Sequence, residues 1–315
     1  MKLEIPENNF LEAVDGRTML AGSNRMEILL FSLGTKETFG INVFKVREVS
    51  KTPFITRAPN MPSGVEGLIS LRGNVIPVLS LAKVLDIAAP GDALGAAMMV
   101  TEYSKRTLGF LVEEVDRIIR VEWDKVRTPE NVSSSVHSFI TAITELPDGS
   151  LVSILDVETI LANTFGEAVI GSIAPISGGH DVNIFFVDDS AVARRKIAEV
   201  LDKLGVKHKH AQNGLEAWTR LEGMASHAQQ TGRPLAEEVD LILVDAEMPE
   251  MDGYVLTRNI KNDPRFEGIP VVMHSSLSSE ANRAMGKRVG VDAYVAKFDA
   301  DVLADTLRPM LNRGH

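Results

Sequence analysis

The hydrophobic rhythm of this chain changes near its middle, and that change limits the folds open to it. From about residue 27 to residue 161, short apolar runs are separated by turn residues, whereas after Asp181 short apolar runs alternate with helical repeats. A chain of 315 residues is also long for one hydrophobic core, so we predict two domains. The predicted parts are an N-terminal segment at 1–24, domains at 25–165 and 182–315, and a linker rich in Gly, Ser and Pro at 166–181.

The first half contains two predicted hairpins. Residues 97–103 and 108–112 flank a polar turn, and residues 140–146 and 151–155 flank the Pro-Asp-Gly sequence at 147–149. Pro, Asp and Gly each favour a turn for a separate conformational reason. Many short strands with frequent turns indicate small β-barrels or a sandwich.

The second half alternates predicted strands with helices. After an apolar strand at 184–187, apolar residues recur at helical spacing from residue 193 to 204. Gly205 then stands where a helix end favours glycine. Three further apolar strands, each followed by a helical pattern, lie at 241–244, 271–273 and 293–296. This alternation predicts a parallel sheet with helices on both faces.

Composition excludes several classes of site and partner. The chain contains no cysteine, which excludes disulfides, thiolate zinc sites and cysteine nucleophiles and fits a reducing compartment. Carboxylates interrupt the N-terminal sequence, and no run reaches the roughly 18 apolar residues of a spanning helix. A net charge of -10 argues against nucleic acid as a partner. We expect a cytoplasmic protein without direct membrane contact, brought to any membrane by its partners.

Charged and hydroxyl side chains stand at the carboxyl ends of the predicted parallel strands. Asp188 and Asp189 stand at the end of the strand at 184–187 and Asp245 at the end of 241–244, while Ser275 stands at the end of 271–273 and Lys297 at the end of 293–296. Functional groups of a doubly wound sheet gather at that edge. Three close carboxylates need a cation, and hard oxygen ligands suit Mg²⁺. Such a carboxylate acts as a nucleophile toward phosphate, with Lys297 neutralising a further phosphoryl oxygen.

Each of these residues also has an ordinary structural explanation. Asp188 and Asp189 would suit a helix N-terminus, whose dipole favours anions. The pair at 252–253 would suit a turn, and Lys297 would suit a solvated surface. We favour a functional site because all of the residues fall at the correct strand ends together.

The run Asp-Ala-Glu-Met-Pro-Glu-Met-Asp-Gly, which begins at Asp245, resembles the phosphorylation-site loop of response-regulator receiver domains. The resemblance spans about residues 182–311 and implies an α/β, flavodoxin-like (βα)5 fold with a parallel five-stranded sheet. It implies that Asp245 accepts phosphate from a histidine kinase, with Ser275 as the switch hydroxyl, Tyr294 as the switch aromatic and Lys297 as the family's lysine. The implied Mg²⁺ ligands are the carboxylates of Asp188, Asp189 and Asp245 and the backbone carbonyl of Glu247.

Two features depart from the receiver pattern. Phe298 follows Lys297 where receivers usually carry proline, so the conformation of that loop is open. Residues 225–239 form a longer connection than usual, and the sequence assigns them no role.

The first half resembles the CheW family, the coupling proteins of chemoreceptor arrays. Residues 39–49 and 67–78 carry the resemblance, with a weaker match at 108–115. It implies an all-β domain of two small barrels side by side, between about residues 25 and 162.

The resemblance also places Val46, Glu48 and Arg72 where that family contacts receptor or kinase. A structural alternative stays open at each position, because Val46 would also suit a core and Glu48 with Arg72 an internal ion pair. A CheW-like domain ahead of a receiver is the architecture of the CheV family. It implies an adaptor that couples chemoreceptors to the histidine kinase CheA, regulated by phosphorylation of Asp245.

Three alternatives have different functions. The first is a phosphate sink for CheA. A transcriptional response regulator needs a DNA-binding output, yet only one helical pattern follows Lys297. A phosphatase needs further catalytic groups, which the first half lacks. We therefore expect a phosphoacceptor that at most dephosphorylates itself, and not an enzyme.

Overall fold

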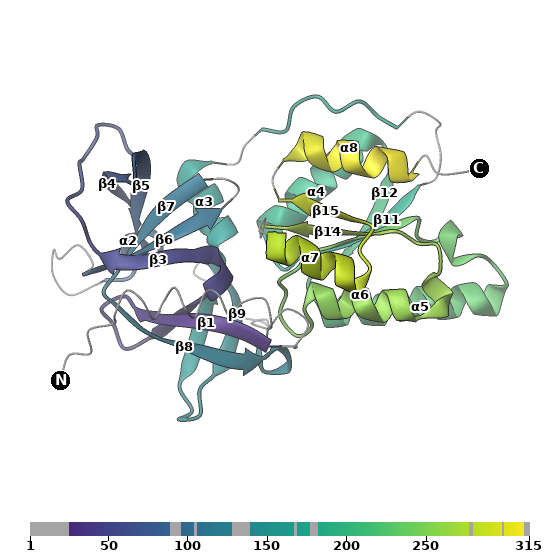
Figure 1. The fold of residues 1–315 in the computed structure, drawn as a ribbon, viewed down its shortest axis with the longest axis horizontal. Helices are drawn as coiled ribbons and strands as arrows, with labels where there is room; N and C mark the ends of the chain where they lie inside the picture. The colour runs from purple at the N-terminus through teal and green to yellow at the C-terminus, as the bar shows by residue number, and fades with distance from the viewer. Residues whose placement is uncertain are drawn as a thin grey trace. The chain divides into compact units, whose positions relative to one another are not determined.

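The fold is known from a computed structural model (Figure 1). It describes residues 25–88, 96–103, 106–127, 139–166, 169–176, 182–276, 280–297 and 299–311. Contacts divide the chain into two compact units. The first unit runs to Glu122 and includes Thr144–Leu155, and the second contains Trp123–Ile143 and Asp156–His315.

Two five-stranded sheets contain the strands of the first half. In spatial order the first sheet is β8 (Glu114–Glu122), β1 (Arg25–Ser32), β2 (Thr38–Asn42), β10 (Leu151–Leu155) and β9 (Ile140–Glu145). The second is β3 (Val46–Lys51), β6 (Ala97–Tyr103), β7 (Arg106–Val112), β5 (Asn74–Ser80) and β4 (Val65–Leu71). The short helices are η2 (Val43–Lys45), α2 (Leu81–Val84), η3 (Trp123–Lys125) and α3 (Val157–Phe165). The predicted all-β, two-part architecture is confirmed.

The predicted hairpin at residues 97–112 is confirmed by the pairing of β6 with β7, which are antiparallel from Ala97 opposite Val112 to Tyr103 opposite Arg106. A second tight connection joins β4 to β5. Its two central residues, Arg72 and Gly73, have φ angles of 49° and 85°. Positive φ at both positions matches the right-handed twist of a two-residue hairpin, which fixes the register of the two strands.

The second half folds into one five-stranded sheet. In spatial order its strands are β12 (Lys207–Ala211), β11 (Asn183–Val187), β13 (Leu241–Val244), β14 (Val271–Ser275) and β15 (Ala293–Ala296). All four neighbouring pairs are parallel, as predicted. The helical segments are α4 (Ala191–Leu204), α5 (Gly214–Thr231), η5 (Leu235–Glu237), α6 (Gly253–Asn262), η6 (Pro264–Phe266), α7 (Glu280–Val289) and α8 (Ala300–Leu311).

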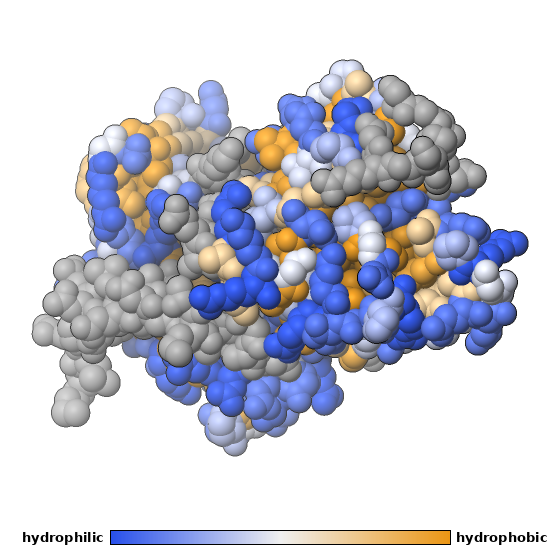
Figure 2. Space-filling view, turned by 45° about the vertical axis from the view of Figure 1, so that its right-hand side comes forward, coloured by the Kyte–Doolittle hydropathy of each residue, from blue (hydrophilic) through white to orange (hydrophobic). Residues whose placement is uncertain are grey.

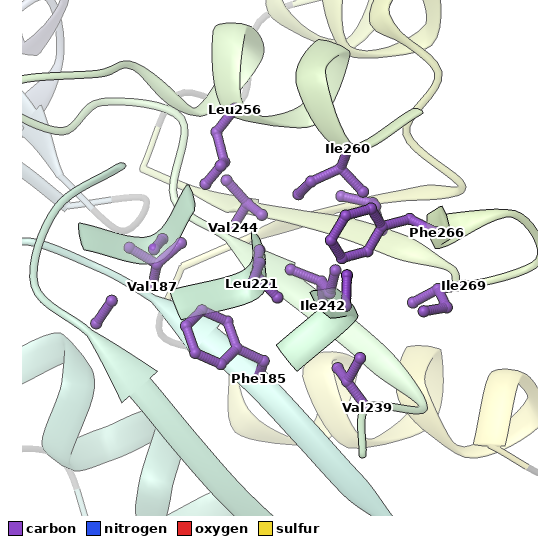
Figure 3. Packing of buried hydrophobic residues seen from close by; sticks show 14 of the residues in the cluster. Phe185, Val187, Leu221, Val239, Ile242, Val244, Leu256, Ile260, Phe266 and Ile269 are labelled. Atoms are coloured by element: carbon purple, nitrogen blue, oxygen red, sulfur yellow. The ribbon is translucent and has the colours of Figure 1, made fainter. Parts of the chain in front are cut away.

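Both faces of the sheet are covered at its central strands, which explains why β11, β13 and β14 are mostly apolar without alternation, whereas the edge strand β12 carries exposed lysine and histidine. In β11, Phe185 and Val187 point into a core with α5 and α6, where they pack near Leu221 and Leu256 (Figure 3). Phe186, between them, belongs to the opposite core, which is formed with α4 and α8. Successive side chains of a strand point to opposite faces, so one strand supplies both cores. The prediction of helices on both faces is confirmed.

Two helices that follow the carboxyl-end loops, α4 and α6, are capped at their N-termini by short polar side chains. Ser190 caps α4 and accepts a hydrogen bond from the amide of Ala193 at 3.4 Å. Asp252 caps α6 and accepts one from the amide of Val255 at 2.7 Å. At the far end of α4, Gly205 has φ 75° and closes the helix in the left-handed conformation, as its sequence position predicts.

Gly253 is required at the start of α6 by its contact with the preceding loop. A Cβ atom at Gly253 would lie 1.9 Å from the carbonyl oxygen of Asp245. Backbone atoms cannot yield as a flexible side chain does, so any larger residue would push Asp245 away from the strand end. The glycine therefore holds the position of Asp245.

Part of the predicted linker packs against the second sheet's helices. Ile173 is 9% exposed and belongs to the core between α4 and α8. Lys203 donates to the carbonyl of Ile170 at 2.6 Å, and Arg308 donates to the carbonyl of Ala174 at 2.8 Å. These contacts fix residues 170–174 on the helices, and the amide of Ile176 likewise donates to the carbonyl of Leu204 at 2.9 Å.

The face of the molecule seen in Figure 2 is mostly hydrophilic, with apolar residues showing between polar ones. This pattern is expected where helices turn their polar faces outward. Within the described ranges, no helix has the length and apolar character needed to cross a membrane.

Candidate functional site

The sheet brings three of the predicted side chains into direct contact at the carboxyl ends of its strands. Asp188 follows β11, Asp245 follows β13 and Lys297 follows β15. The Nζ atom of Lys297 lies 2.8 Å from Oδ2 of Asp245 and 2.8 Å from Oδ2 of Asp188. All three residues are buried, with exposures of 4% or less. The alternative of Lys297 as a solvated surface residue is therefore wrong.

Asp189 completes an acidic cluster with the two buried carboxylates. Asp188, Asp189 and Asp245 each offer a carboxylate oxygen within 4.8 Å of the others, and Asp189 is half-buried. Three hard oxygen donors at this spacing, partly open to water, fit a Mg²⁺ ion. Glu247 lies in the loop two residues after Asp245, and the role of its backbone carbonyl as a ligand stays a prediction.

Burial sets the protonation of this cluster. It raises the pKa of Asp245 well above its ordinary value, against the opposing effect of the Lys297 ammonium. Burial likewise raises the pKa of Asp188 to about 7. Burial alone would lower the pKa of Lys297, but the carboxylates of Asp188 and Asp245 outweigh it and raise the pKa. The site thus keeps one ammonium among more carboxylates than it can neutralise, an arrangement that favours binding of a further cation.

Two residues that sequence reasoning missed also contact the cluster. Glu158, in the first turn of α3, places Oε1 3.2 Å from Nζ of Lys297. Thr141, in β9, donates from Oγ1 to Oδ2 of Asp189 at 2.6 Å. Both belong to the same compact unit as the cluster. Nothing in the local sequence signals these contacts, because each depends on where β9 and α3 are placed in space.

Arg194 is less exposed than its position in a run of basic residues predicts. A run of basic residues in α4 is normally the solvated face of a helix, yet Arg194 is half-buried. Its Nη1 donates to the backbone carbonyls of Asp188 at 2.8 Å and Asp189 at 2.9 Å. Arg194 therefore fixes the loop that carries two members of the acidic cluster.

Ser275 and Tyr294 lie on the neighbouring strands β14 and β15. Ser275 is fully buried, and Tyr294 is half-buried beneath the guanidinium of Arg283, whose Cζ lies 5.4 Å from the ring centre. Burial raises the pKa of Tyr294 to about 12, although its interaction with the Ser275 hydroxyl opposes that rise. The two residues predicted to act as a switch are therefore linked to each other.

The sequence left two features of the second half without an assignment, namely the residue after Lys297 and the connection at 225–239. Phe298, the departure from the usual proline, lies outside the described residues. The long connection at 225–239 forms the last turns of α5 and the short helix η5. His227 and Glu238 bridge it, with Nδ1 2.6 Å from Oε1.

The three predicted partner-binding residues of the first half differ in how far their side chains are exposed. Val46 is 1% exposed, so it packs in the core and has no side-chain surface to offer a partner. Arg72 and Glu48 form an ion pair, in which the Arg72 side chain remains 79% exposed. The Arg72 side chain is thus accessible to a partner at the β4–β5 turn, and the ion pair with Glu48 restricts its conformation.

Comparison with known proteins assigns each half to a family. Residues 27–165 match the CheW-like domain, and residues 184–308 match the response regulator receiver domain. Chemotaxis protein CheV3 of Helicobacter pylori is 30% identical, over 87% of this chain and 89% of its own length. Chemotaxis protein CheV1 of the same organism is 29% identical, over 91% of this chain and 94% of its own length.

The chain belongs to the CheV family. As a CheV-type protein it is a chemotaxis signalling protein with a CheW-like coupling domain and a receiver domain. The crystal structure of the scaffolding protein CheW from Thermoanaerobacter tengcongensis is 28% identical to this chain, with a TM-score of 0.41. It covers 45% of this chain and 90% of its own.

Proposed function

We propose that Asp245 accepts a phosphoryl group from a phosphohistidine of the kinase CheA, and that this modification regulates coupling of CheA to chemoreceptors. The observation that carries the proposal is the shared contact of Lys297 with Asp188 and Asp245, at 2.8 Å each. A buried carboxylate beside an ammonium and two further carboxylates suits attack on phosphorus, where negative charge must be neutralised.

The transfer involves one bond formed and one bond broken. An Oδ atom of Asp245 attacks phosphorus, and the P–N bond of the phosphohistidine breaks. The electron pair of that bond leaves with the imidazole, which takes up a proton as it departs. Lys297 donates a hydrogen bond to a phosphoryl oxygen. When held by Asp188, Asp189, Asp245 and the carbonyl of Glu247, Mg²⁺ supplies positive charge that offsets the crowded anions.

Ser275 and Tyr294 transmit the modification. Phosphorylation adds charge and acceptor oxygens beside the end of β14, and the hydroxyl of Ser275 moves to donate to one of them. Tyr294, which shares a hydrogen bond with Ser275, turns into the space this movement leaves. The resulting change on the α7, β15 and α8 face is the signal. Water later cleaves the acyl phosphate, so the protein resets itself without turning over an external substrate.

The CheW-like domain supplies the coupling contacts, and the β4–β5 turn is the surface best suited to them. Arg72 stands at this turn with its side chain 79% exposed. Val75, three residues later, is 69% exposed. An exposed arginine beside an exposed apolar side chain is the combination enriched at protein interfaces. Charge reversal at Arg72 should weaken retention of CheA or receptor on the immobilised protein.

Phosphoryl transfer from radiolabelled phospho-CheA in the presence of Mg²⁺ tests the proposal. We expect label on the wild type and none on Asp245→Asn. Asp202→Asn makes the same change at an exposed position of α4 and should accept label like the wild type. Equal labelling of wild type and Asp245→Asn, or no labelling of either, would exclude Asp245 as the acceptor.

A further inference from the structure

The proposed phosphoacceptor is closed to a phosphodonor in this structure. The side chain of Asp245 is 4% exposed and that of Lys297 is 1% exposed. An in-line attack needs the phosphorus of the donor in contact with an Oδ atom of Asp245. Some part of the chain must therefore move before phosphate can reach the carboxylate.

Glu158 is one residue that closes the site. Its side chain is 3% exposed, and its Oε1 lies 3.2 Å from Nζ of Lys297, on the same ammonium that contacts Asp245. Glu158 therefore occupies a hydrogen-bonding position that a phosphoryl oxygen needs. It also adds a carboxylate at the place where an anionic donor must enter, which raises the electrostatic cost of entry.

Thr141 restrains another part of the site. Its hydroxyl donates to Oδ2 of Asp189 at 2.6 Å, and that oxygen belongs to the carboxylate proposed to bind Mg²⁺. The loop after Asp245 is held as well, because the amide of Glu250 donates to the carbonyl of Trp123 at 3.1 Å. These contacts come from residues outside the receiver match at 184–308 but inside the same compact unit.

We propose that Glu158 and Thr141 form a latch over the acid site, and that opening of this latch is coupled to phosphorylation of Asp245. The inference rests on the proposed function of Asp245. A phosphoryl group on Asp245 takes the ammonium of Lys297 away from Glu158 and repels its carboxylate, so the phosphorylated protein releases α3. By linkage, a protein whose latch is open accepts phosphate more readily, because the same free-energy coupling acts in both directions.

The first test measures phosphorylation by phosphoramidate, a small donor that needs no kinase contact. Glu158→Gln removes the charge but keeps the shape, and Thr141→Val removes the hydroxyl donor. The phosphorylation rate should rise on the order of tenfold in Glu158→Gln, because a like charge is removed from the entry path. It should rise further in the double variant. Glu222→Gln, the same change at a half-exposed position of α5, should match the wild type.

The outcomes separate the two proposals. If neither the wild type nor Glu158→Gln is phosphorylated with Mg²⁺ present, the proposed function fails. If the wild type is phosphorylated at Asp245 and both latch variants react at the wild-type rate, the function stands and the latch is overturned.

Hydrogen exchange of the full chain tests the latch without any substitution. Beryllofluoride with Mg²⁺ serves as the phosphoryl mimic. We expect the amides of α3 to exchange faster once the mimic is bound, while those of α5 stay unchanged. Unchanged protection of α3 in the presence of bound beryllofluoride would overturn the latch.

Discussion

The Nζ atom of Lys297 lies 2.8 Å from Oδ2 of Asp245, although the two residues are 52 positions apart in the sequence. Parallel strands β13 and β15 bring them to the same edge of the sheet with only β14 between them. The contact places the ammonium that would stabilise a transferred phosphoryl group beside the proposed acceptor carboxylate. The same contact also makes Lys297 a structural residue, because it neutralises buried carboxylates.

Replacing Lys297 should therefore weaken the fold as well as the chemistry. Lys297→Met leaves Asp188, Asp245 and Glu158 buried without their shared ammonium, and loss of one partner of a buried ion pair costs about 3–5 kcal/mol. Urea unfolding would measure it, followed by the fluorescence of Trp218 in a Trp123→Phe background. Lys209→Met, on an exposed position of β12, is the control. Equal losses in the two variants would contradict a structural role for Lys297.

Mg²⁺ should stabilise the receiver through the acidic cluster. A ligand present at 100 times its dissociation constant raises the free energy of unfolding by about 2.7 kcal/mol. We expect a rise in the unfolding midpoint with Mg²⁺ in the wild type and little or none in Asp189→Asn. Asp202→Asn should respond as the wild type does. A Mg²⁺ response that survives in Asp189→Asn would show that the ion binds elsewhere.

The cap of α6 should make stability depend on pH. Burial raises the pKa of Asp252 to about 6, against hydrogen bonds that oppose the rise. Because the folded-state pKa lies above the unfolded value of about 3.9, the carboxyl stabilises the fold fully below pH 4. That contribution is lost as the pH rises through 6. Asp252→Asn keeps a capping oxygen without the charge, so it should gain stability over the wild type at pH 8, on the order of 2 kcal/mol.

Urea unfolding of both proteins at pH 5 and pH 8 measures this effect. The advantage of Asp252→Asn should be about half as large at pH 5 as at pH 8, because pH 5 lies midway between the unfolded and folded pKa values. An advantage of the same size at both values would mean that the buried charge of Asp252 is not its cause.

Glycine substitutions should have opposite effects at two helix positions. A Cβ at Gly253 would meet the carbonyl oxygen of Asp245 at 1.9 Å, so Gly253→Ala should lose about 2 kcal/mol through forced displacement of that loop. At Gly223, in the exposed face of α5, a Cβ has nothing within 4 Å. Gly223→Ala should gain about 0.5–1 kcal/mol because alanine favours a helix. Thermal unfolding gives both values, and similar effects at the two sites would contradict this assignment.

The sequence allowed prediction of the second half's fold because its signals are local. Apolar strands such as β13, followed by helical repeats, determine a parallel sheet, and a parallel sheet places the strand-end residues Asp188, Asp245 and Lys297 on one edge. Their contact follows from topology and needs no knowledge of distant packing.

The missed residues depend on packing between distant segments. Glu158 follows the Asp156 cap of α3, and this pattern indicates only a helix start. Arg194 belongs to a basic run in which the next residue, Arg195, is exposed, so only the path of the loop at 188–189 reveals its carbonyl contacts. The packing of Ile173 between α4 and α8 was missed for a similar reason, because the Gly and Pro residues around it predict a linker.

The most direct test of the receiver's chemistry identifies the residue that carries phosphate. Borohydride reduces an acyl phosphate to an alcohol, so trapping the phosphorylated protein and sequencing its peptides by mass spectrometry marks the acceptor aspartate as homoserine. We predict homoserine at position 245, dependent on both Mg²⁺ and the phosphodonor. Homoserine at position 188 or 189, or phosphorylated protein without any homoserine, would contradict the assignment of Asp245 as the phosphoacceptor.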